Sequence, residues 1–255
     1  VNMFENFLQV YNNDFLLHNC YEHKEKFLEQ AINNNYFLQQ ENDNLFFLNK
    51  KNLFYFINEI KQYNLQPSFV RLIGNHEKYF KKHEYFLKLN NFKCCRIFKQ
   101  MTLKNENLTP IKFDFINKPS IDEATECYDF LNSNFKYEFN LFYQRNNFQK
   151  YINNILCYKE NNQICGVLLH TNIFNNAILD YIIIKPNLKY KNIGYALLNH
   201  FFLENKNAKF YKLYVNINNI KAINFYKRSN FVFNNKTELR IYRNFYDIHK
   251  NILND

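Results

Sequence analysis

Glycine, proline and tryptophan are scarce in this sequence, whose 255 residues include 3 Gly, 4 Pro and no Trp. Asn, Lys, Ile, Phe and Tyr crowd the whole length instead, a bias that we attribute to the genome rather than to one surface. Hydrophobic residues make up 47% and aromatic residues 19% of the chain, which is ample material for a buried core. The length exceeds the usual domain size of roughly 100 to 150 residues, so we expect one large or two modest domains.

Metal-binding and membrane-spanning patterns are also absent. The six cysteines form no CxxC pair, and no histidine stands at a metal-ligand spacing, so we expect no metal site. The N-terminal residues show no basic-then-apolar signal, and no run of about 18 or more apolar residues could span a membrane. We therefore expect a reduced, cytoplasmic protein with no membrane partner.

The charge balance is basic, with 33 Lys and Arg against 23 Asp and Glu and a formal net charge of +10. Such a charge could attract nucleic acid, a membrane surface or a phosphorylated cofactor. The lysines are scattered among Asn and aromatic residues, however, and no arginine-rich tract occurs. We interpret them as solvated faces and rank a nucleic-acid-binding protein third among the functions considered.

Hydrophobic periodicity in the first half predicts a mixture of helices and strands. Residues 1–30 have a helical pattern, residues 36–40 and 45–48 flank a polar turn and predict a hairpin, and residues 53–60 fit either a strand or a short helix. The remaining expected elements are a strand over 69–73, a helix over 77–89 and a strand over 93–101. The polar, proline-containing stretch 102–110 marks a boundary between domains 1–108 and 109–255.

The second half alternates strands with helices, which predicts an α/β unit with a mixed sheet. Strands are expected over 111–116, 155–158, 164–170, 177–184, 211–217 and 237–242. Helices are expected after Pro119 and over 141–154, 193–203 and 220–228.

One junction in this half can bind an anion. The buried strand over 177–184 is stopped by Pro186, and a basic loop then leads into a helix that starts at Ile193. Unpaired backbone N–H groups and the helix dipole make such a helix start positive, and Lys189 and Lys191 add charge. A pyrophosphate fits that arrangement.

The same loop resembles the acetyl-CoA loop of the GNAT superfamily of N-acetyltransferases, Arg/Gln-x-x-Gly-x-Gly/Ala. Lys189, Asn192 and Gly194 fall on its three marked positions. Lysine keeps the charge of arginine, and asparagine tolerates a positive φ better than most residues, although its side chain could crowd a phosphate.

A second segment strengthens the resemblance. Asn219, Ala222, Phe225, Tyr226 and Phe231 follow the family's Asn-x-x-Ala-x-x-Phe-Tyr-x-x-x-Gly-Phe in order and spacing. Asn replaces its glycine at position 230, and Asn is the common alternative at a left-handed helix end. The resemblance covers about residues 111–242.

The resemblance implies that acetyl-CoA lies where two neighbouring parallel strands diverge, here 177–184 and 211–217. Backbone groups of Ile182 and Ile184 would hold the thioester, so apolar side chains suffice there. Asn219 matches a residue that contacts the cofactor in relatives, and an N-cap role is the alternative. The implied cofactor-binding residues are Ile182, Ile184, Lys189, Tyr190, Lys191, Asn192, Ile193, Gly194, Tyr195, Asn219 and Tyr226.

Two catalytic residues are predicted. Tyr226 matches the family tyrosine that can protonate the departing CoA sulfur, and packing is its alternative role. Asp180 is the only charge in its apolar strand, and strand alternation places it on the face of Ile182 and Ile184, which makes it a candidate base. A solvated aspartate is its alternative, and His170 and Glu138 are weaker candidates for the base.

The first half resembles the second more faintly. Phe86-Leu87 and Asn91-Phe92 parallel Phe225-Tyr226 and Asn230-Phe231, which places Leu87 where Tyr226 stands. Residues 53–69 hold no glycine and are too short for a strand, a phosphate loop and a helix. The first half is thus predicted as a degenerate tandem copy without a site, and two unrelated α/β units are the alternative.

The resemblance therefore predicts transfer of an acetyl group from acetyl-CoA to a primary amine by direct attack, with no metal and no covalent intermediate. A GNAT-like fold that only binds CoA or a protein partner is the second candidate. The acceptor, a small molecule or a peptide, and the oligomeric state cannot be inferred from the sequence.

Overall fold

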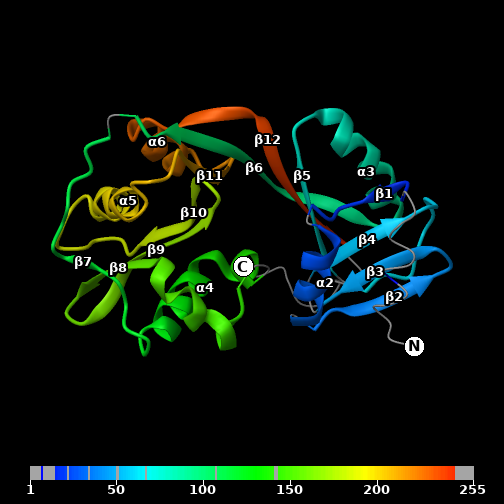
Figure 1. The fold of residues 1–255 in the computed structure, drawn as a ribbon, viewed down its shortest axis with the longest axis horizontal. Coiled ribbons are helices and arrows are strands. Elements are labelled where there is room, and N and C mark those ends of the chain that lie inside the picture. The colour runs from blue at the N-terminus through cyan, green and yellow to red at the C-terminus, as the bar shows by residue number, and fades with distance from the viewer. Residues whose placement is uncertain are drawn as a thin grey trace. The chain divides into compact units, whose positions relative to one another are not determined.

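The computed structural model describes residues 7, 15–21, 23–33, 35–49, 52–66, 68–106, 108–140 and 143–244, which form two compact units (Figure 1). Unit 1 comprises residues 1–99, 216–218 and 235–255, and unit 2 comprises residues 100–215 and 219–234. Strands β6 (Phe92–Lys104) and β12 (Val232–Asn244) contribute residues to both units. Compact units need not coincide with folding domains, so the division at residue 108 stays a prediction.

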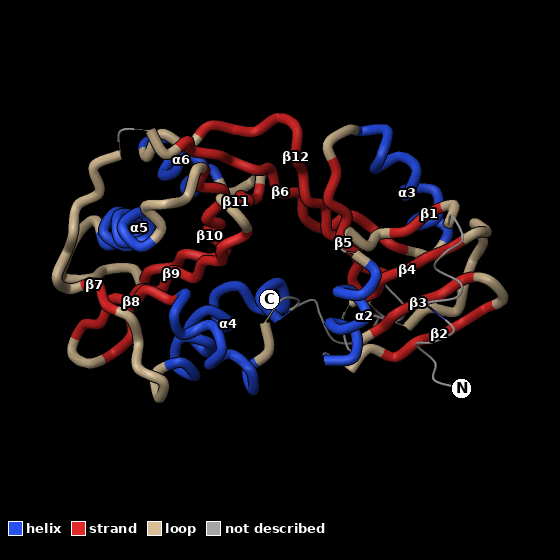
Figure 2. The backbone as a smooth tube through the Cα atoms, in the orientation of Figure 1, coloured by secondary structure: helices blue, strands red, loops and turns tan. Residues whose placement is uncertain are grey.

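Unit 1 is built on a four-stranded antiparallel sheet with the order β1-β4-β3-β2. Its strands are β1 (Leu17–His18), β2 (Phe37–Glu41), β3 (Asn44–Leu48) and β4 (Leu53–Ile57). Helices α2 (Lys24–Asn33) and α3 (Glu77–Leu89) lie on opposite sides of this sheet (Figure 2). Strand β5 (Phe69–Gly74) pairs with the part of β12 that belongs to unit 1.

Alternation along β3 and β4 explains the two helix layers of unit 1. Phe47 and Phe56 belong to the core under α2, whereas their neighbours Phe46 and Tyr55 belong to the core under α3. Both faces of each strand are apolar, so the sheet can bury a helix on each side.

Unit 2 has a mixed sheet with the strand order β12-β6-β11-β10-β9-β8-β7. Its further strands are β7 (Ile116–Asn117), β8 (Ile155–Glu160), β9 (Gln163–Ile173), β10 (Asn176–Ile184) and β11 (Phe210–Asn216). Helix α4 (Ala124–Asn140) and the 3-10 helix η1 (Arg145–Asn154) cover one face, and α5 (Ile193–Glu204) and α6 (Ile220–Arg228) cover the other. Figure 1 shows α4 and α5 on opposite sides of β8 to β10.

Most predicted elements are confirmed, including the hairpin β2-β3 and the helices over 77–89 and 220–228. Residues 53–57 are a strand. The strand predicted over 111–116 is wrong, because only Ile116 and Asn117 pair. The N–H of Ile111 donates to Asn199 Oδ1 and that of Phe113 to His200 Nε2, so this stretch is held by side chains of α5.

Two helix predictions are corrected in part. Residues 145–154 form a 3-10 helix rather than an α-helix, and residues 141–142 lie outside the described part. In the region predicted as helical over 1–30, Leu17 and His18 form a strand and α2 begins at Lys24. Residues 1–6 and 8–14 lie outside the described part.

Asparagine takes the left-handed positions that glycine usually occupies. None of the described glycines has a positive φ, and apart from Phe174 the non-glycine residues that do are all Asn. They are Asn35, Asn42, Asn91, Asn161, Asn162, Asn187, Asn192 and Asn230. Asn is the residue that best tolerates this region after Gly, so a glycine-poor sequence can still make tight turns and helix ends.

Candidate functional site

Strands β10 and β11 pair only over their first halves. Their parallel register begins with Asn176 opposite Phe210 and ends with Leu179 opposite Leu213. β10 continues to Ile184 and β11 to Asn216, and these described residues do not pair with each other. The strands therefore diverge and leave one edge of β10 open.

The open edge carries free backbone donors. The N–H of Lys185 donates to the C=O of Cys165 in β9 at 2.8 Å. Alternate residues of a strand direct their N–H groups to the same side, so those of Ile182 and Ile184 point away from β9. They face the side from which β11 has diverged, as expected for backbone groups that would hold a thioester.

A shaped loop joins this open edge to helix α5. Asn192 is left-handed, with φ 64° and ψ 22°, and immediately precedes the helix. The first backbone bond of the helix runs from the N–H of Ala196 to the C=O of Asn192 at 3.0 Å. The N–H groups of residues 193–195 precede that bond and can therefore bind an anion at the positive end of the helix dipole.

Side chains elsewhere in unit 2 hold the loop in place. The N–H of Lys189 donates to Glu160 Oε1 at 3.2 Å. The ring of Tyr190 stacks on that of Phe115, with centroids 5.7 Å apart and an interplanar angle of 13°. The basic loop is therefore ordered by this hydrogen bond and by aromatic contacts of Tyr190 with Phe115 and Tyr158.

A pocket of about 920 Å³ lies at this helix start. It is lined by Ile184, Lys185, Asn187, Leu188, Tyr190, Lys191, Asn192, Ile193, Gly194, Tyr195, Phe225, Arg228 and Ser229. Three of these residues are cationic, which suits a ligand carrying several phosphates. Seven predicted cofactor residues line the pocket, whereas Ile182, Lys189, Asn219 and Tyr226 do not.

The sequence interpretation missed six lining residues. Lys185, Asn187 and Leu188 belong to the loop that was already singled out. Phe225, Arg228 and Ser229 come from α6 and its C-cap at i, i+3 and i+4, so they share one helix face. That spacing was readable in the sequence, but the direction of the face was not.

Gly194 keeps the helix start close to β10. An added Cβ would lie 2.9 Å from Ile184 Cδ1 and 3.6 Å from the Phe225 ring. Any other residue here would press on Ile184 and contact Phe225, which both line the pocket.

Asp180 lies on the other face of β10 from the one predicted. The β9 register shifts between Leu179 and Tyr181, so Asp180 is an extra residue that interrupts the alternation. Ile182 and Ile184 pack with the core under α5, whereas Asp180 lies beside Tyr143 and Thr171 on the α4 face. A bulge of this kind leaves no trace in the hydrophobic pattern.

The carboxyl group of Asp180 is buried. Burial raises its pKa to about 7, and the neighbouring Thr171 and Tyr143 side chains partly oppose this rise. Its Oδ2 is buried without a hydrogen-bond partner. A carboxyl with these properties can exchange a proton near neutral pH.

Tyr226 packs within the core of unit 2. Its side chain is 6% exposed, and its ring lies 5.8 Å from that of Phe231 and 5.3 Å from that of Phe225 between centroids. Burial raises the pKa of its phenol, so the hydroxyl stays protonated at neutral pH. The packing role is observed, and the acid role stays a prediction.

Two of the remaining candidates have structural partners. Asn219 caps α6, because its Oδ1 accepts the N–H of Ala222 at 3.0 Å. His170 is buried with Nε2 3.4 Å from Glu204 Oε2. The side chain of Glu138 lies outside the described residues.

Among the described residues, no three His, Cys, Asp or Glu side chains come together in a way that could hold a metal ion. The described part of the chain also contains no helix long and apolar enough to cross a membrane.

Residues 121–231 match the family model described as the acetyltransferase (GNAT) family. This segment is a GNAT acetyltransferase domain. It contains the diverging strands, the loop before α5 and helix α6. The predicted resemblance to the GNAT family, which rested on two sequence motifs within this segment, is therefore confirmed. No protein of curated function matches the chain in sequence.

Solved structures with the same fold extend beyond the GNAT domain. A GNAT acetyltransferase from Colwellia psychrerythraea is 12% identical, with a TM-score of 0.54 over 96% of this chain and 98% of that one. A GCN5-related N-acetyltransferase from Kribbella flavida is 9% identical, with a TM-score of 0.51 over 88% and 94%. The predicted α/β fold with a mixed sheet is thus confirmed.

A third structure is longer than this chain. The GCN5-related N-acetyltransferase from Sphaerobacter thermophilus is 16% identical, with a TM-score of 0.49 over 69% of this chain. The chain covers 59% of the length of that protein.

Proposed function

We propose that the GNAT domain transfers an acetyl group from acetyl-CoA to the amine of a small molecule or peptide. The observation that carries this proposal is the end of the β10-β11 pairing at Leu179 and Leu213, next to the pocket at the start of α5. An open strand edge with free N–H groups beside an anion-binding helix start suits a long ligand with a phosphate end and an acyl end.

The residues at the helix start fit the phosphate end of CoA. The N–H groups of residues 193–195 would hold the pyrophosphate, and Lys191 and Arg228 would add charge. Gly194 would leave room for this group, because a side chain there would press on Ile184 and Phe225, which line the pocket. The left-handed φ of Asn192 gives the loop its shape without the glycine of the family pattern.

Acetyl-CoA supplies an acetyl group activated as a thioester. The N–H groups of Ile182 and Ile184 would polarise the acyl carbonyl and fix its position. Asp180 would accept the proton of the attacking amine, directly or through water, because its pKa of about 7 is close to working pH. The phenol of Tyr226 would donate a proton to the departing sulfur.

The test is turnover by thiol release with a library of primary amines, alongside titration with acetyl-CoA. We expect binding and turnover with at least one amine. Binding without turnover across the library would favour an inactive CoA-binding module. Absence of acetyl-CoA binding at millimolar concentration would contradict the proposal.

A further inference from the structure

The strands β4 and β5 of unit 1 repeat the divergence of β10 and β11. They are parallel and joined by the single bridge between Asn52 and Phe69, after which neither strand pairs with the other over its described residues. β3 pairs with the far edge of β4, as β9 does with β10. Both units therefore contain a groove between two diverging parallel strands.

In unit 1 this groove holds part of the chain itself. Residues 17–21, which we call the inserted segment, begin as β1 on the edge of β4 that faces β5. Asn19 is fully buried and binds β4 at three points. Its N–H donates to the C=O of Tyr55 at 3.3 Å, its Oδ1 accepts the N–H of Tyr55 at 2.8 Å, and its Nδ2 donates to the C=O of Leu53 at 3.1 Å.

The inserted segment also reaches β5. The hydroxyl of Tyr21 accepts the N–H of Ile73 at 2.5 Å and lies 2.8 Å from the hydroxyl of Tyr79 in α3. Asn19 Nδ2 lies 3.5 Å from the C=O of Arg71. The side chains of Asn19 and Tyr21 therefore bind backbone groups of both strands, β4 on one side of the groove and β5 on the other. These are backbone groups that β4 and β5 do not bond to each other because they diverge.

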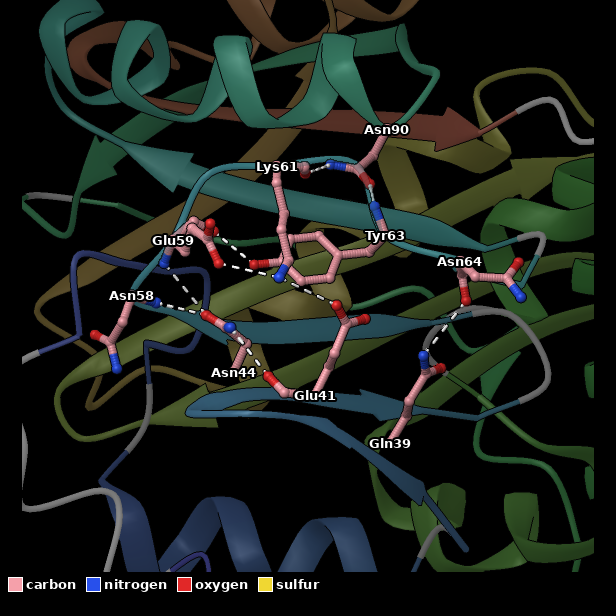
Figure 3. A network of polar contacts seen from close by, with 9 residues as sticks. All are labelled: Gln39, Glu41, Asn44, Asn58, Glu59, Lys61, Tyr63, Asn64 and Asn90. Atoms are coloured by element: carbon pink, nitrogen blue, oxygen red, sulfur yellow. Dashed lines mark hydrogen bonds and ion pairs between the residues drawn. The ribbon is translucent and has the colours of Figure 1, made fainter.

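The described residues between β4 and β5, 58–66 and 68, contain no helix that could bind phosphate. Residues 58–66 instead form a loop fixed by side chains of neighbouring elements (Figure 3). Asn90 Oδ1 accepts the N–H of Tyr63 at 2.7 Å, and Asn90 Nδ2 donates to the C=O of Lys61 at 3.0 Å. Asn44 Oδ1 accepts the N–H of Asn58 at 2.8 Å.

The helices that follow the two grooves end alike. Asn91 after α3 and Asn230 after α6 are both left-handed, with φ of 61° and 65°. The N–H of Asn91 donates to the C=O of Lys88, as that of Asn230 does to Lys227. Leu87 and Tyr226 occupy the same turn position in these helix ends, which supports the degenerate-copy hypothesis.

We propose that the inserted segment is a built-in occupant of the unit 1 groove, lying where unit 2 would hold the arm of its acyl donor. Asn19 and Tyr21 replace the ligand's hydrogen bonds to the two strands, and the loop over 58–66 replaces the phosphate-binding helix. Unit 1 is therefore closed to CoA, and the full chain binds one CoA.

Cys20 reports on the position of the inserted segment, because the residue is buried, with an exposed fraction of 5%. The experiment follows modification of Cys20 by a maleimide in the full chain, by peptide mapping, relative to the same thiol in the denatured chain. Tyr21→Phe removes the hydroxyl that binds Ile73 and should speed modification roughly tenfold. Tyr85→Phe is the matched control, because Tyr85 is 64% exposed on α3 and should leave the rate unchanged.

Asn19→Ala should speed the modification further, and hydrogen exchange at the Tyr55 amide should rise with it. Saturating acetyl-CoA should leave the Cys20 rate unchanged, with a stoichiometry of one. Modification of Cys20 in the native chain as fast as in the denatured chain would overturn the proposal. So would acceleration by acetyl-CoA, or a second bound CoA. If no CoA binds at all, the proposed function of unit 2 is contradicted. The Cys20 modification rates still test whether the inserted segment lies in the unit 1 groove.

Discussion

Asp180 lies beside Tyr143, on the face of β10 opposite the core that packs under α5. The pocket at the start of α5 is on the other face, so an acyl donor and an acceptor amine would approach the open end of β10 from opposite sides. In the proposed reaction, Asp180 would therefore meet the acceptor amine from the α4 face of β10.

Replacing Asp180 with Asn should lower turnover roughly 100-fold or more, because it removes the proposed base but keeps the size of the side chain. The wild-type rate should rise with pH through an apparent pKa near 7, as the carboxyl group ionises. The variant should lose this rise. Asp114→Asn is the control, because Asp114 has a 97% exposed side chain. Equal pH profiles for wild type and Asp180→Asn would exclude the base role.

The same substitution should stabilise the fold at alkaline pH. The folded pKa of Asp180 is about 7 and the ordinary value is 3.8, so its contribution to stability becomes unfavourable as pH rises between these values. The ionised, buried carboxylate therefore destabilises the fold fully above pH 7, and it has no such effect below pH 3.8, where the carboxyl is protonated in both the folded and the unfolded chain. A shift of this size corresponds to roughly 4 kcal/mol at most. Thermal unfolding at pH 8 and pH 4 should show a higher midpoint for Asp180→Asn at pH 8 only. A gain of equal size at both pH values would contradict a buried ionising carboxyl.

Tyr226→Phe should separate catalysis from packing. The ring stays in the core beside Phe231, so folding should survive, and acetyl-CoA affinity should change little. Loss of a positioned acid typically lowers turnover roughly 100- to 10,000-fold. Thiol release measures turnover, and a titration measures affinity. Turnover within about threefold of wild type would assign Tyr226 to packing alone.

Substitutions of Gly194 should separate the effect of size from that of charge. An alanine Cβ meets the tip of Ile184, which can move, so Gly194→Ala should weaken the acetyl-CoA thermal shift only partly. Gly194→Asp adds a negative charge next to the phosphate site and should abolish the shift. If the folded Asp variant keeps the full shift, the pyrophosphate site lies elsewhere.

The sequence predicted the helices and strands around the site well, because its motifs and hydrophobic periods are local. The loop before Ile193 and the end of α6 were recognisable from Asn192 and Asn230, since Asn takes over left-handed positions of glycine. The face of Asp180 was not predictable, because a bulge shifts the alternation by one residue without changing the composition of the strand.

Long-range contacts account for the other misses. Residues 111–115 have a strand-like pattern, but side chains of Asn199 and His200 bind their backbone instead. The groove filled by residues 17–21 depends on Asn19 and Tyr21 reaching strands that lie more than 30 residues further along the chain. No short motif records such contacts.

Hydrogen exchange at single amides tests the central claim most directly. Acetyl-CoA should slow exchange at Ile182 and Ile184, which point to the open edge of β10, and at residues 193–195 at the start of α5. Val167 and Leu168 in β9 should serve as references that do not change, because the sheet already holds both amides: Val167 pairs with Ile183 of β10, and Leu168 pairs with Leu156 of β8. Slowing confined to these two sets of amides is the result expected for an acyl donor held between the diverging strands. Binding of acetyl-CoA with no change at Ile182 and Ile184 would contradict the account.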